Sequence, residues 1–489
     1  MLFNSYIFIL FFLPVALAGY YGLNDRGKYS LAKVLLIGMS LWFYAYFEPA
    51  YLLIILTSIF VNYLFSKMIN QGSAVLGTKV RKLVLILGIV FNVGIIFYYK
   101  YFNFFLENLN VLFHREWELR NILMPLGISF FTFQQISYLV DSWRGETKDY
   151  SFVDYILFVS FFPQLIAGPI VFHDEMIPQF NDRERKKFSH DKLAAGLWIF
   201  SIGLFKKVLI ADTLGRGADY GFSNIAALSG AEAVLVMLCY TLQLYFDFSG
   251  YCDMAIGIGR MFQIEIPLNF NSPYKAISVT DFWNRWHMTL SRFLRKYIYF
   301  PLGGSRRGQL CTIRNILIVF LVSGIWHGAA WTFVLWGVLH GLIRAIERVL
   351  GGLLEKVPKV IRWLVTFLFV NLAWILFRAQ TIEDAILFYT KLFTGWKETS
   401  QGGLFAQFHI IEFTYIVEHV QVLSSFVGRY PWIYMAIVLG GSLLIALFMK
   451  NCHEKEFKLS FKTAIATIVM LAWSVVSFSG ISTFLYFNF

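Results

Sequence analysis

His327 is the residue whose surroundings point most clearly to chemistry. It lies in the segment SGIWHGAAW, residues 323–331, and no Asp, Glu, Lys or Arg occurs between Arg314 and Arg344. A helical path places it about 20 Å from the nearest charged residues. Ionisable groups in apolar surroundings are costly, and a buried imidazole that water can reach can act as a neutral base. The alternative is a histidine hydrogen-bonded between two helices, and the flanking glycines permit a break in the chain.

A second histidine, His287, follows two tryptophans in a segment with helical spacing. Apolar residues recur at positions 283, 286, 290, 294 and 297, and basic residues at 285, 292 and 296 fall near the opposite face. This is helical spacing across residues 283–297, and it places His287 on the aromatic face. Such a helix suits the membrane interface or the wall of a cytoplasmic cavity, where its arginines could contact lipid headgroups or a phosphate-bearing donor. A histidine of the interfacial aromatic belt is the alternative.

Two carboxylates, Asp247 and Asp253, stand in the aromatic segment YFDFSGYCD, residues 245–253. They are candidates for pairing with arginines such as Arg260 or Arg285, or for holding helix termini. Glycoside hydrolysis by paired carboxylates is the less favoured interpretation, because the surroundings are those of a lipid-embedded chain.

Other chemistry-bearing signatures are weak in this sequence. The four cysteines are scattered without metal-binding spacing, and no Walker loop, Gly-Xaa-Ser-Xaa-Gly elbow or HExxH helix occurs. We therefore expect no bound metal and no resident cofactor. A third histidine in apolar surroundings, His340, is expected to be mainly structural.

The composition indicates a membrane protein. Of 489 residues, 58% are hydrophobic and only 15% are charged, against roughly 25% charged in soluble domains. These values exclude a soluble globular enzyme, a disordered chain and a disulfide scaffold. The net charge of +12 is typical of cytoplasmic anchoring loops rather than of nucleic-acid binding, so no nucleic-acid partner is expected.

The elements that must position these residues are predicted to be helices. Crossing a bilayer takes about 20 apolar residues, and on this criterion we expect an all-α polytopic membrane protein with about 10–13 transmembrane helices. The candidate spans are 5–23, 31–47, 50–68, 83–103, 121–140, 152–171, 194–211, 230–248, 311–326, 329–346, 359–377, 431–449 and 463–486. Basic clusters that mark cytoplasmic loops indicate that one segment within 121–171 re-enters without crossing. The candidate is FPQLIAGP, residues 162–169, which two prolines and a glycine interrupt.

In its motifs the chain resembles the membrane-bound O-acyltransferase family, and within it the bacterial alginate O-acetyltransferase branch. The matching text includes PLGISF (125–130), LIAGPI (165–170), KK (206–207) with AD (211–212), QLYFDFSGY (243–251), DMAIG (253–257), FW (282–283), RWH (285–287), PLGG (301–304) and WHG (326–328). The resemblance covers almost the whole chain in the same order. The family pattern differs at Asn284, where a basic residue is usual, and at Asp281, where glutamate is expected.

The resemblance implies a single integral-membrane domain, residues 1–489, whose transmembrane, re-entrant and interfacial helices surround a central tunnel. Residues 1–120 would form N-terminal helices, 121–350 the catalytic tunnel core and 351–489 C-terminal helices. His327 would be the central catalytic residue, and His287 would assist it or line the donor side. The expected substrate and tunnel residues are Trp326, Trp286, Trp283, Arg285, Asp247, Asp253 and Gln243.

The resemblance further implies an O-acyltransferase of the bacterial inner membrane. It would move an acetyl group from a cytoplasmic thioester, acetyl-coenzyme A or an acyl-carrier protein, for O-acetylation of an exported or cell-wall polysaccharide such as alginate. An extracytoplasmic acetyltransferase partner would complete the transfer, and peptidoglycan acetylation also remains open. The alternatives are D-alanyl transfer to teichoic acid from a carrier protein and a non-enzymatic polysaccharide or lipid transporter. The sequence has no clear internal repeat, which weakens the transporter interpretation.

Overall fold

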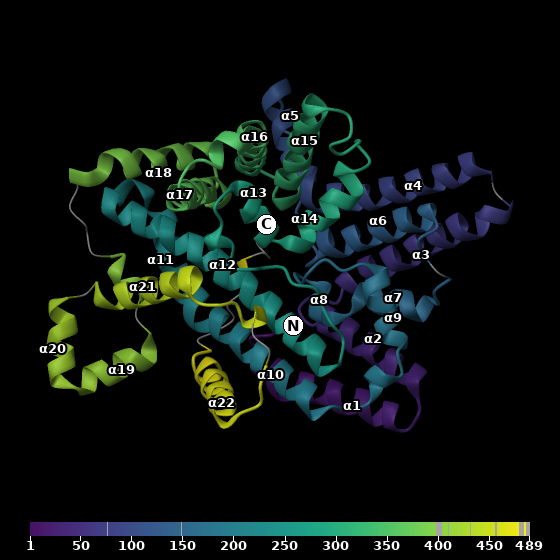
Figure 1. Ribbon diagram of the computed structural model, residues 1–489, viewed down its shortest axis with the longest axis horizontal. Helices are drawn as coiled ribbons and strands as arrows, with labels where there is room; N and C mark the ends of the chain where they lie inside the picture. The colour runs from purple at the N-terminus through teal and green to yellow at the C-terminus, as the bar shows by residue number, and fades with distance from the viewer. Residues whose placement is uncertain are drawn as a thin grey trace. The chain divides into compact units, whose positions relative to one another are not determined.

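The computed structural model describes residues 1–75, 77–147, 149–397, 403–408, 410–430, 432–454, 457–478 and 484–485. Within these ranges the regular structure consists of helices alone (Figure 1). The all-α prediction is confirmed.

Eight of the described helices are long and apolar enough to cross a membrane. They are Phe8–Asp25, Tyr51–Asn70, Thr78–Phe113, His190–Ser223, Gly230–Met261, Gln309–His327, Lys359–Arg378 and Ile433–Glu454, and two shorter apolar helices are Tyr29–Ala45 and Phe461–Val476. Three expected spans take another form. The chain at 121–140 gives only the 17-residue helix Ile128–Arg144, 152–171 is not one helix, and 329–346 lies in a longer helix with a charged C-terminal half.

The chain divides into two compact units. Unit 1 comprises Met1–Phe200 and Cys252–Leu268, and unit 2 comprises Ser201–Tyr251 and Asn269–Phe489. Helices α10 (His190–Phe205) and α12 (Gly230–Met261) have residues in both units. The organisation as a single domain with three parts stays a prediction.

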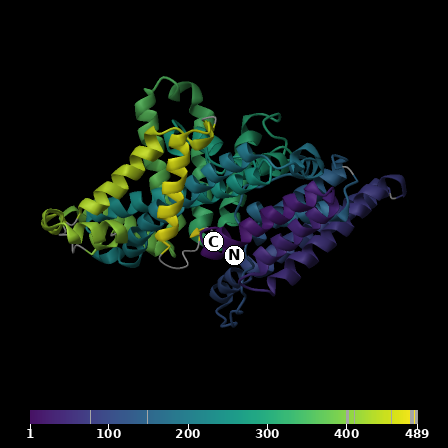
Figure 2. The same ribbon diagram turned by 90° about the horizontal axis from the view of Figure 1, so that it is seen from below.

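Unit 1 consists of helices, most of them apolar. It contains α1 (Leu13–Asp25), α2 (Tyr29–Ala45), α3 (Tyr51–Val75), α4 (Thr78–Ile96), α5 (Phe102–Phe113), α6 (Ile128–Arg144), α7 (Phe152–Ser160), α8 (Phe162–Leu165) and α9 (His173–Asn181). Helices α1 to α4 pack one against the next, and α6 packs on both α3 and α4 (Figures 1 and 2). Asn62 of α3 and Asn92 of α4, both fully buried, exchange amide hydrogen bonds, because a lone amide in an apolar bundle needs a partner.

The predicted interruption near residues 162–169 is present in unit 1. Helix α8 has only four residues, and the chain from Ile166 to Phe172 is non-helical although it is buried throughout. Hydrogen bonds satisfy part of the backbone here: the amide of Gly168 donates to the carbonyl of Gln164 at 3.1 Å, and at the start of α8 the amide of Phe162 donates to the Ser40 hydroxyl at 3.2 Å. Irregular backbone at membrane depth requires such partners. That this segment re-enters the membrane stays a prediction.

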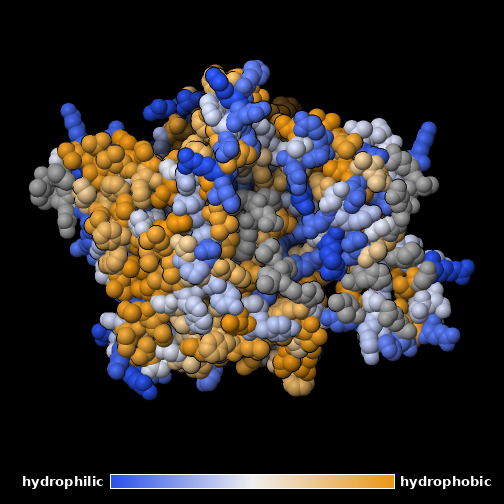
Figure 3. Space-filling view, turned by 180° about the vertical axis from the view of Figure 1, so that it is seen from behind, coloured by the Kyte–Doolittle hydropathy of each residue, from blue (hydrophilic) through white to orange (hydrophobic). Residues whose placement is uncertain are grey.

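Unit 2 contains the candidate catalytic residues. Its helices are α11 (Asp212–Ser223), α13 (Val279–Arg285), α14 (Met288–Leu294), α15 (Gln309–His327), α16 (Trp331–Leu354), α17 (Lys359–Arg378), α18 (Ile382–Thr394), α19 (Ile411–His419), α20 (Gln421–Arg429), α21 (Ile433–Phe448) and α22 (Phe461–Val476). Many large apolar side chains of the chain are exposed, among them Leu310, Val360 and Phe461. Figure 3 shows broad hydrophobic areas on one face of the molecule, as a lipid-facing surface requires.

Helices α15 and α16 form a tight antiparallel hairpin because glycines face each other in the contact (Figure 1). A Cβ atom on Gly324 would lie 2.5 Å from the carbonyl oxygen of Phe333, and one on Gly337 would lie 2.5 Å from that of Phe320. Backbones that approach this closely leave room only for glycine. The hairpin holds the end of α15, where His327 lies, against α16.

A buried ionic cluster joins α12 to the chain that leads into α11. The Lys207 ammonium lies 2.6 Å from the Asp247 carboxylate and 2.8 Å from that of Asp212. Lys207 and Asp247 are 1% and 3% exposed. Asp247 also accepts the backbone amide of Leu485 at 2.9 Å, and the Lys207 ammonium lies 4.7 Å from the ring centroid of Phe484. Asp247 therefore pairs with a lysine, and its predicted pairing with Arg260 or Arg285 is wrong.

Replacing Gly337 by alanine should destabilise the α15–α16 hairpin. Alanine favours a helix over glycine by about 1 kcal/mol, but the added methyl overlaps backbone atoms of α15 and costs about 1–3 kcal/mol. The midpoint of thermal unfolding of the purified protein in detergent measures the balance. Gly352→Ala on the same helix is the matched control, since its Cβ meets nothing within 4 Å. Equal midpoints for the two variants would contradict the close contact.

Replacing Lys207 by methionine should be more damaging, because it leaves two carboxylates without their buried cation. Breaking a buried ion pair on one side costs about 3–5 kcal/mol. The double variant Lys207→Met with Asp247→Asn should recover part of this loss, since the remaining buried charge is also removed. Thermal unfolding midpoints and yields from membranes measure both effects. A single variant as stable as the parent protein would show that the ionic cluster does not hold these helices together.

Candidate active site

His327 is the last residue of α15, and the chain turns sharply after it. Gly328 caps the helix in an extended conformation, and the chain re-enters a helix at Trp331. A Cβ atom on Gly328 would lie 2.1 Å from the ring of Phe333, so no other residue fits this corner. The helix does break at the glycines that flank His327, as the sequence permitted. The His327 imidazole stays buried there, with 4% of the residue exposed.

The helical spacing across residues 283–297 does not form one helix, and the break lies at His287. Helix α13 ends at Arg285 and α14 begins at Met288, so that Trp286 and His287 lie between them. A continuous helix turns successive side chains by about 100°, whereas this break buries both, with 3% and 0% exposed. His287 adopts a left-handed backbone conformation with φ 44°. This conformation costs about 1–3 kcal/mol in a residue with a Cβ, and such strain clusters at functional sites.

The two breaks bring the two histidines together. The ring centroids of His287 and His327 are 6.3 Å apart. Imidazoles at this separation can both reach one small polar group placed between them. Aromatic rings lie close to both: Trp326 lies 4.9 Å and Trp336 5.1 Å from the His327 ring, and Phe248 lies 4.9 Å from the His287 ring. All of these residues belong to unit 2.

The side-chain amide of Asn269 holds His287. Its Nδ1 lies 3.2 Å from Oδ1 of Asn269, and the same oxygen accepts hydrogen bonds from the amide and hydroxyl of Thr289. Complete burial lowers the pKa of His287 to about 3, because the charged imidazolium is poorly solvated there. His287 is therefore neutral at physiological pH and can accept a proton only transiently.

An aromatic shell surrounds the pair and fixes its geometry. The Trp283 indole donates to Nδ1 of His340 at 3.1 Å, and His340 is fully buried among aromatic rings. The Trp336 ring stacks on that of Trp374 with centroids 5.7 Å apart, and Trp286 lies 5.1 Å from Trp374. His340 thus packs among aromatic rings, and Trp283, Trp286 and Trp326 lie in the shell. That these tryptophans contact substrate or line a tunnel stays a prediction.

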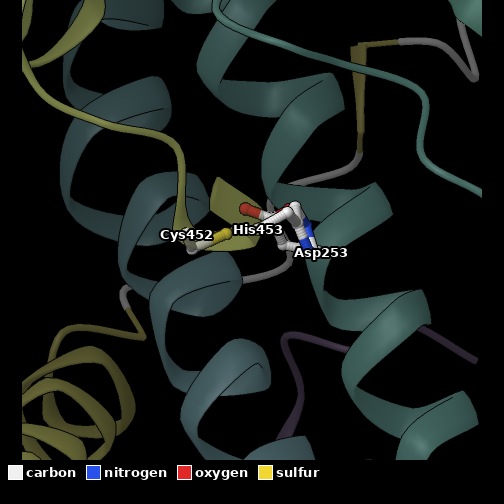
Figure 4. Close-up of side chains that lie close together, drawn as sticks. All are labelled: Asp253, Cys452 and His453. Atoms are coloured by element: carbon white, nitrogen blue, oxygen red, sulfur yellow. The ribbon is translucent and has the colours of Figure 1, made fainter. Parts of the chain in front are cut away.

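The remaining predicted residues lie elsewhere or serve other contacts. Arg285 pairs with Asp281, one turn away on α13, at 2.8 Å, so its predicted pairing with the carboxylates of α12 is wrong. Gln243 packs on Gly215, where a Cβ would lie 2.7 Å from its amide nitrogen. Asp253 is buried on α12 in the part that belongs to unit 1 (Figure 4). Of the predicted site residues, His287, His327 and the tryptophans at 283, 286 and 326 therefore lie in unit 2, whereas Asp253 does not.

A cavity of about 470 Å³ lies in unit 2 beside this shell. Its polar lining consists of Thr280, Asn284, Ser291, Arg295, Tyr299, Ser305, Thr312, Ser323, Arg344, Glu347 and Arg348, and its apolar lining includes Trp283, Leu294, Ile316, Val319 and Phe320. Glu347 caps α13 by accepting the amides of Val279 and Thr280 at 2.6 and 2.8 Å. Its charge is thus engaged, and the three arginines make the cavity basic.

The sequence suggested a cavity wall near His287 but missed the arginines that line this cavity, Arg295, Arg344 and Arg348. Arg344 served only to mark where an apolar stretch ends, although residues 344, 347, 348 and 351 recur at helical spacing on one face of α16. That spacing is the signal that could have found it. Asn284, which departs from the family pattern, also lines the cavity and is exposed.

The family model of the membrane-bound O-acyltransferases matches residues 90–383. The chain is 41% identical to "Peptidoglycan O-acetyltransferase" of Helicobacter pylori, over 100% of this chain and 98% of that protein. It is 41% identical to "Probable alginate O-acetylase AlgI" of Pseudomonas aeruginosa, over 81% of this chain and 75% of the relative. Similarity to "Teichoic acid D-alanyltransferase" of Bacillus subtilis is lower, 29% over 50% of this chain and 63% of that protein.

The family model covers more than half of the chain, including both histidines, the aromatic shell and the basic cavity. Two similar proteins with acetyltransferase names match most or all of its length, and its long apolar helices are those of a multi-pass membrane protein. The chain therefore belongs to the membrane-bound O-acyltransferase family and is an O-acyltransferase.

Proposed function

We propose that the chain takes an acetyl group from a cytoplasmic thioester and passes it through the bacterial inner membrane for O-acetylation of a cell-wall or exported polysaccharide. The observation that supports this proposal is the pair of buried imidazoles, 6.3 Å apart, next to a basic cavity. The alternative of a non-enzymatic transporter does not account for that pair.

The chemistry proposed is general-base catalysis by His327. Its imidazole takes the proton of an acceptor hydroxyl as the hydroxyl oxygen bonds to the thioester carbonyl carbon. The carbon–sulfur bond then breaks, and the thiolate leaves with the proton returned to it. His287 stays neutral at physiological pH, as its lowered pKa requires, and hydrogen-bonds to the reacting groups. The aromatic shell excludes bulk water, which would otherwise hydrolyse the thioester.

We assign the donor to the basic cavity. Arg295, Arg344 and Arg348 suit the phosphates of a phosphopantetheine thioester, whether it comes on coenzyme A or on a carrier protein. The apolar depth of the cavity, which reaches Phe320 and Ser323, suits the pantetheine arm. Ser323 precedes His327 by one turn of α15.

One aromatic layer separates this cavity from the catalytic imidazole. His327 is not among the residues that line the cavity. Trp336 lies between, with its ring 5.8 Å from Trp283 of the lining and 5.1 Å from His327. In the proposed reaction Trp283 or Trp336 must therefore shift before the acetyl carbonyl reaches His327.

Peptidoglycan is the acceptor class that the end-to-end match favours, since the similarity to the peptidoglycan enzyme covers the whole chain while the alginate match covers 81% of it. In either case an extracytoplasmic acetyltransferase or the polysaccharide itself receives the acetyl group. D-alanyl transfer to teichoic acid is less favoured, because the similarity to that enzyme covers only half of the chain.

His327→Ala should abolish acetyl transfer while the protein still accumulates in membranes. Loss of a general base lowers the rate by about 10²–10⁴-fold. The measurement is incorporation of labelled acetyl from acetyl-coenzyme A into the peptidoglycan and exopolysaccharide fractions of cells or membranes. His190→Ala is the matched control, since it removes an exposed histidine at the start of α10. Full activity of His327→Ala would reject the assignment, and the labelled fraction identifies the acceptor class.

Arg344→Met should weaken donor binding without changing the chemical step. Losing a hydrogen bond to a charged group costs about 1.5–3 kcal/mol, which corresponds to a rise of about 10- to 100-fold in KM for the donor with little change in kcat. Arg429→Met removes the same charge from an exposed position on α20 outside the cavity and should leave both constants unchanged.

Initial rates with acetyl-coenzyme A and with an acetylated carrier protein distinguish the two donors. A KM unchanged for both in Arg344→Met would show that this cavity does not take the donor.

A further inference from the structure

The segment that begins with Asn269 clamps the break between α13 and α14. The amide of Met288 donates to the backbone carbonyl of Asn269 at 3.0 Å, and the amide of Asn271 donates to the carbonyl of Arg285 at 2.9 Å. The backbone of Asn269 accepts the first of these bonds. Its side chain, only 1% exposed, contacts His287. The clamp therefore holds the left-handed histidine from both sides.

The hydrogen bonds at Asn269 decide which atom of its amide faces His287. A backbone N–H can only donate, so the atom that faces the amide of Thr289 at 3.2 Å must be the oxygen, Oδ1. The Thr289 hydroxyl, 2.8 Å away, donates to the same oxygen. Rotating the amide by 180° would place an NH₂ group against the N–H of Thr289, which is unfavourable.

The same oxygen decides which nitrogen of His287 carries the proton. Oδ1 of Asn269 accepts only, and Nδ1 of His287 lies 3.2 Å from it. A hydrogen bond at this place requires a proton on Nδ1. In a neutral imidazole the lone pair then resides on Nε2, at the opposite edge of the ring.

We propose that Asn269 is a positioning residue, whose amide oxygen holds His287 as the Nδ1–H tautomer so that Nε2 presents its lone pair to the reacting groups. This inference rests on the proposed function, in which His287 hydrogen-bonds to those groups. A second partner that orients an imidazole and selects its tautomer recurs in catalytic and metal-binding histidines.

Asn269, from the segment before α13, is a polar neighbour of Nδ1 of His287. Among the residues that the structure describes, Phe248 of α12 and Trp326 and His327 of α15 also lie near the ring. Of these neighbours, His327 is titratable. Any change of pH response in an Asn269 variant must therefore be separated from titration of His327.

Two variants at Asn269 separate positioning from packing. Asn269→Leu has a similar size but no acceptor, so His287 loses its tautomer preference and kcat should fall by about 10- to 100-fold, with KM for acetyl-coenzyme A changed little. Asn269→Asp keeps the acceptor and adds a charge that favours the imidazolium. It should retain activity, and the acid limb of its kcat profile should move to higher pH.

Thr289→Val is the matched control. It removes one hydrogen bond to the same oxygen but leaves the contact with Nδ1, so kcat and the pH profile should stay close to those of the parent. A merely structural role of Asn269 predicts instead that Thr289→Val and Asn269→Leu lose stability together and that the Asn269→Asp profile does not move. Either result overturns the proposal.

Nitrogen-15 NMR of histidine-labelled full-length protein tests the tautomer directly, even if no acetyl transfer is found. The His287 signals are assigned by their loss in His287→Gln. We expect a protonated-type Nδ1 and an unprotonated-type Nε2 in the parent protein, and a mixture in Asn269→Leu. A parent protein with the proton on Nε2 would refute the positioning role independently of the proposed function.

Discussion

The structure depends on holding polar, proton-carrying groups inside an apolar helical protein. Every such group must find a partner or shift its protonation, because the charged form is poorly solvated there. The chain meets this constraint by ending helices where a functional group is needed. His327 closes α15, and His287 lies between α13 and α14. At such ends the backbone can turn a side chain inward to a place that a continuous helix would not reach.

Close-fitting glycines allow α15 to end at His327, and a strained backbone at His287 allows the break between α13 and α14. Gly328 fits a corner that the ring of Phe333 fills, and Gly324 and Gly337 let α15 and α16 approach until their backbones touch. That approach brings Trp336 against His327 and so completes the aromatic shell. At His287 the left-handed conformation is unfavourable by itself, and the segment at Asn269 offsets it with backbone and side-chain hydrogen bonds. Packing and polar partners together therefore determine where the two imidazoles lie.

The distribution of charge follows the same constraint. Lys207 and Asp247 pair in the interior, and Glu347 caps α13. Arg295, Arg344 and Arg348 line a cavity in which Glu347 is the acidic residue. The cavity is basic because three arginines outnumber one glutamate, whose oxygens accept hydrogen bonds from backbone amides. This charge suits an anionic donor.

The sequence by itself determined the class of the protein and its family, and it named the candidate site residues. Composition and long apolar stretches predicted an all-helical membrane protein, and the segments around His287 and His327 predicted its family, because both signals are local in the chain. Only the tertiary structure decided which side chains contact one another. The pairing of Asp247 with Lys207, the break at Trp286–His287 and the basic cavity all join residues far apart in sequence or override helical periodicity. Sequence periodicity reports the pattern of a single helix. Where a helix ends, and which charged residue a buried charge pairs with, depend on the other parts of the chain that pack against it.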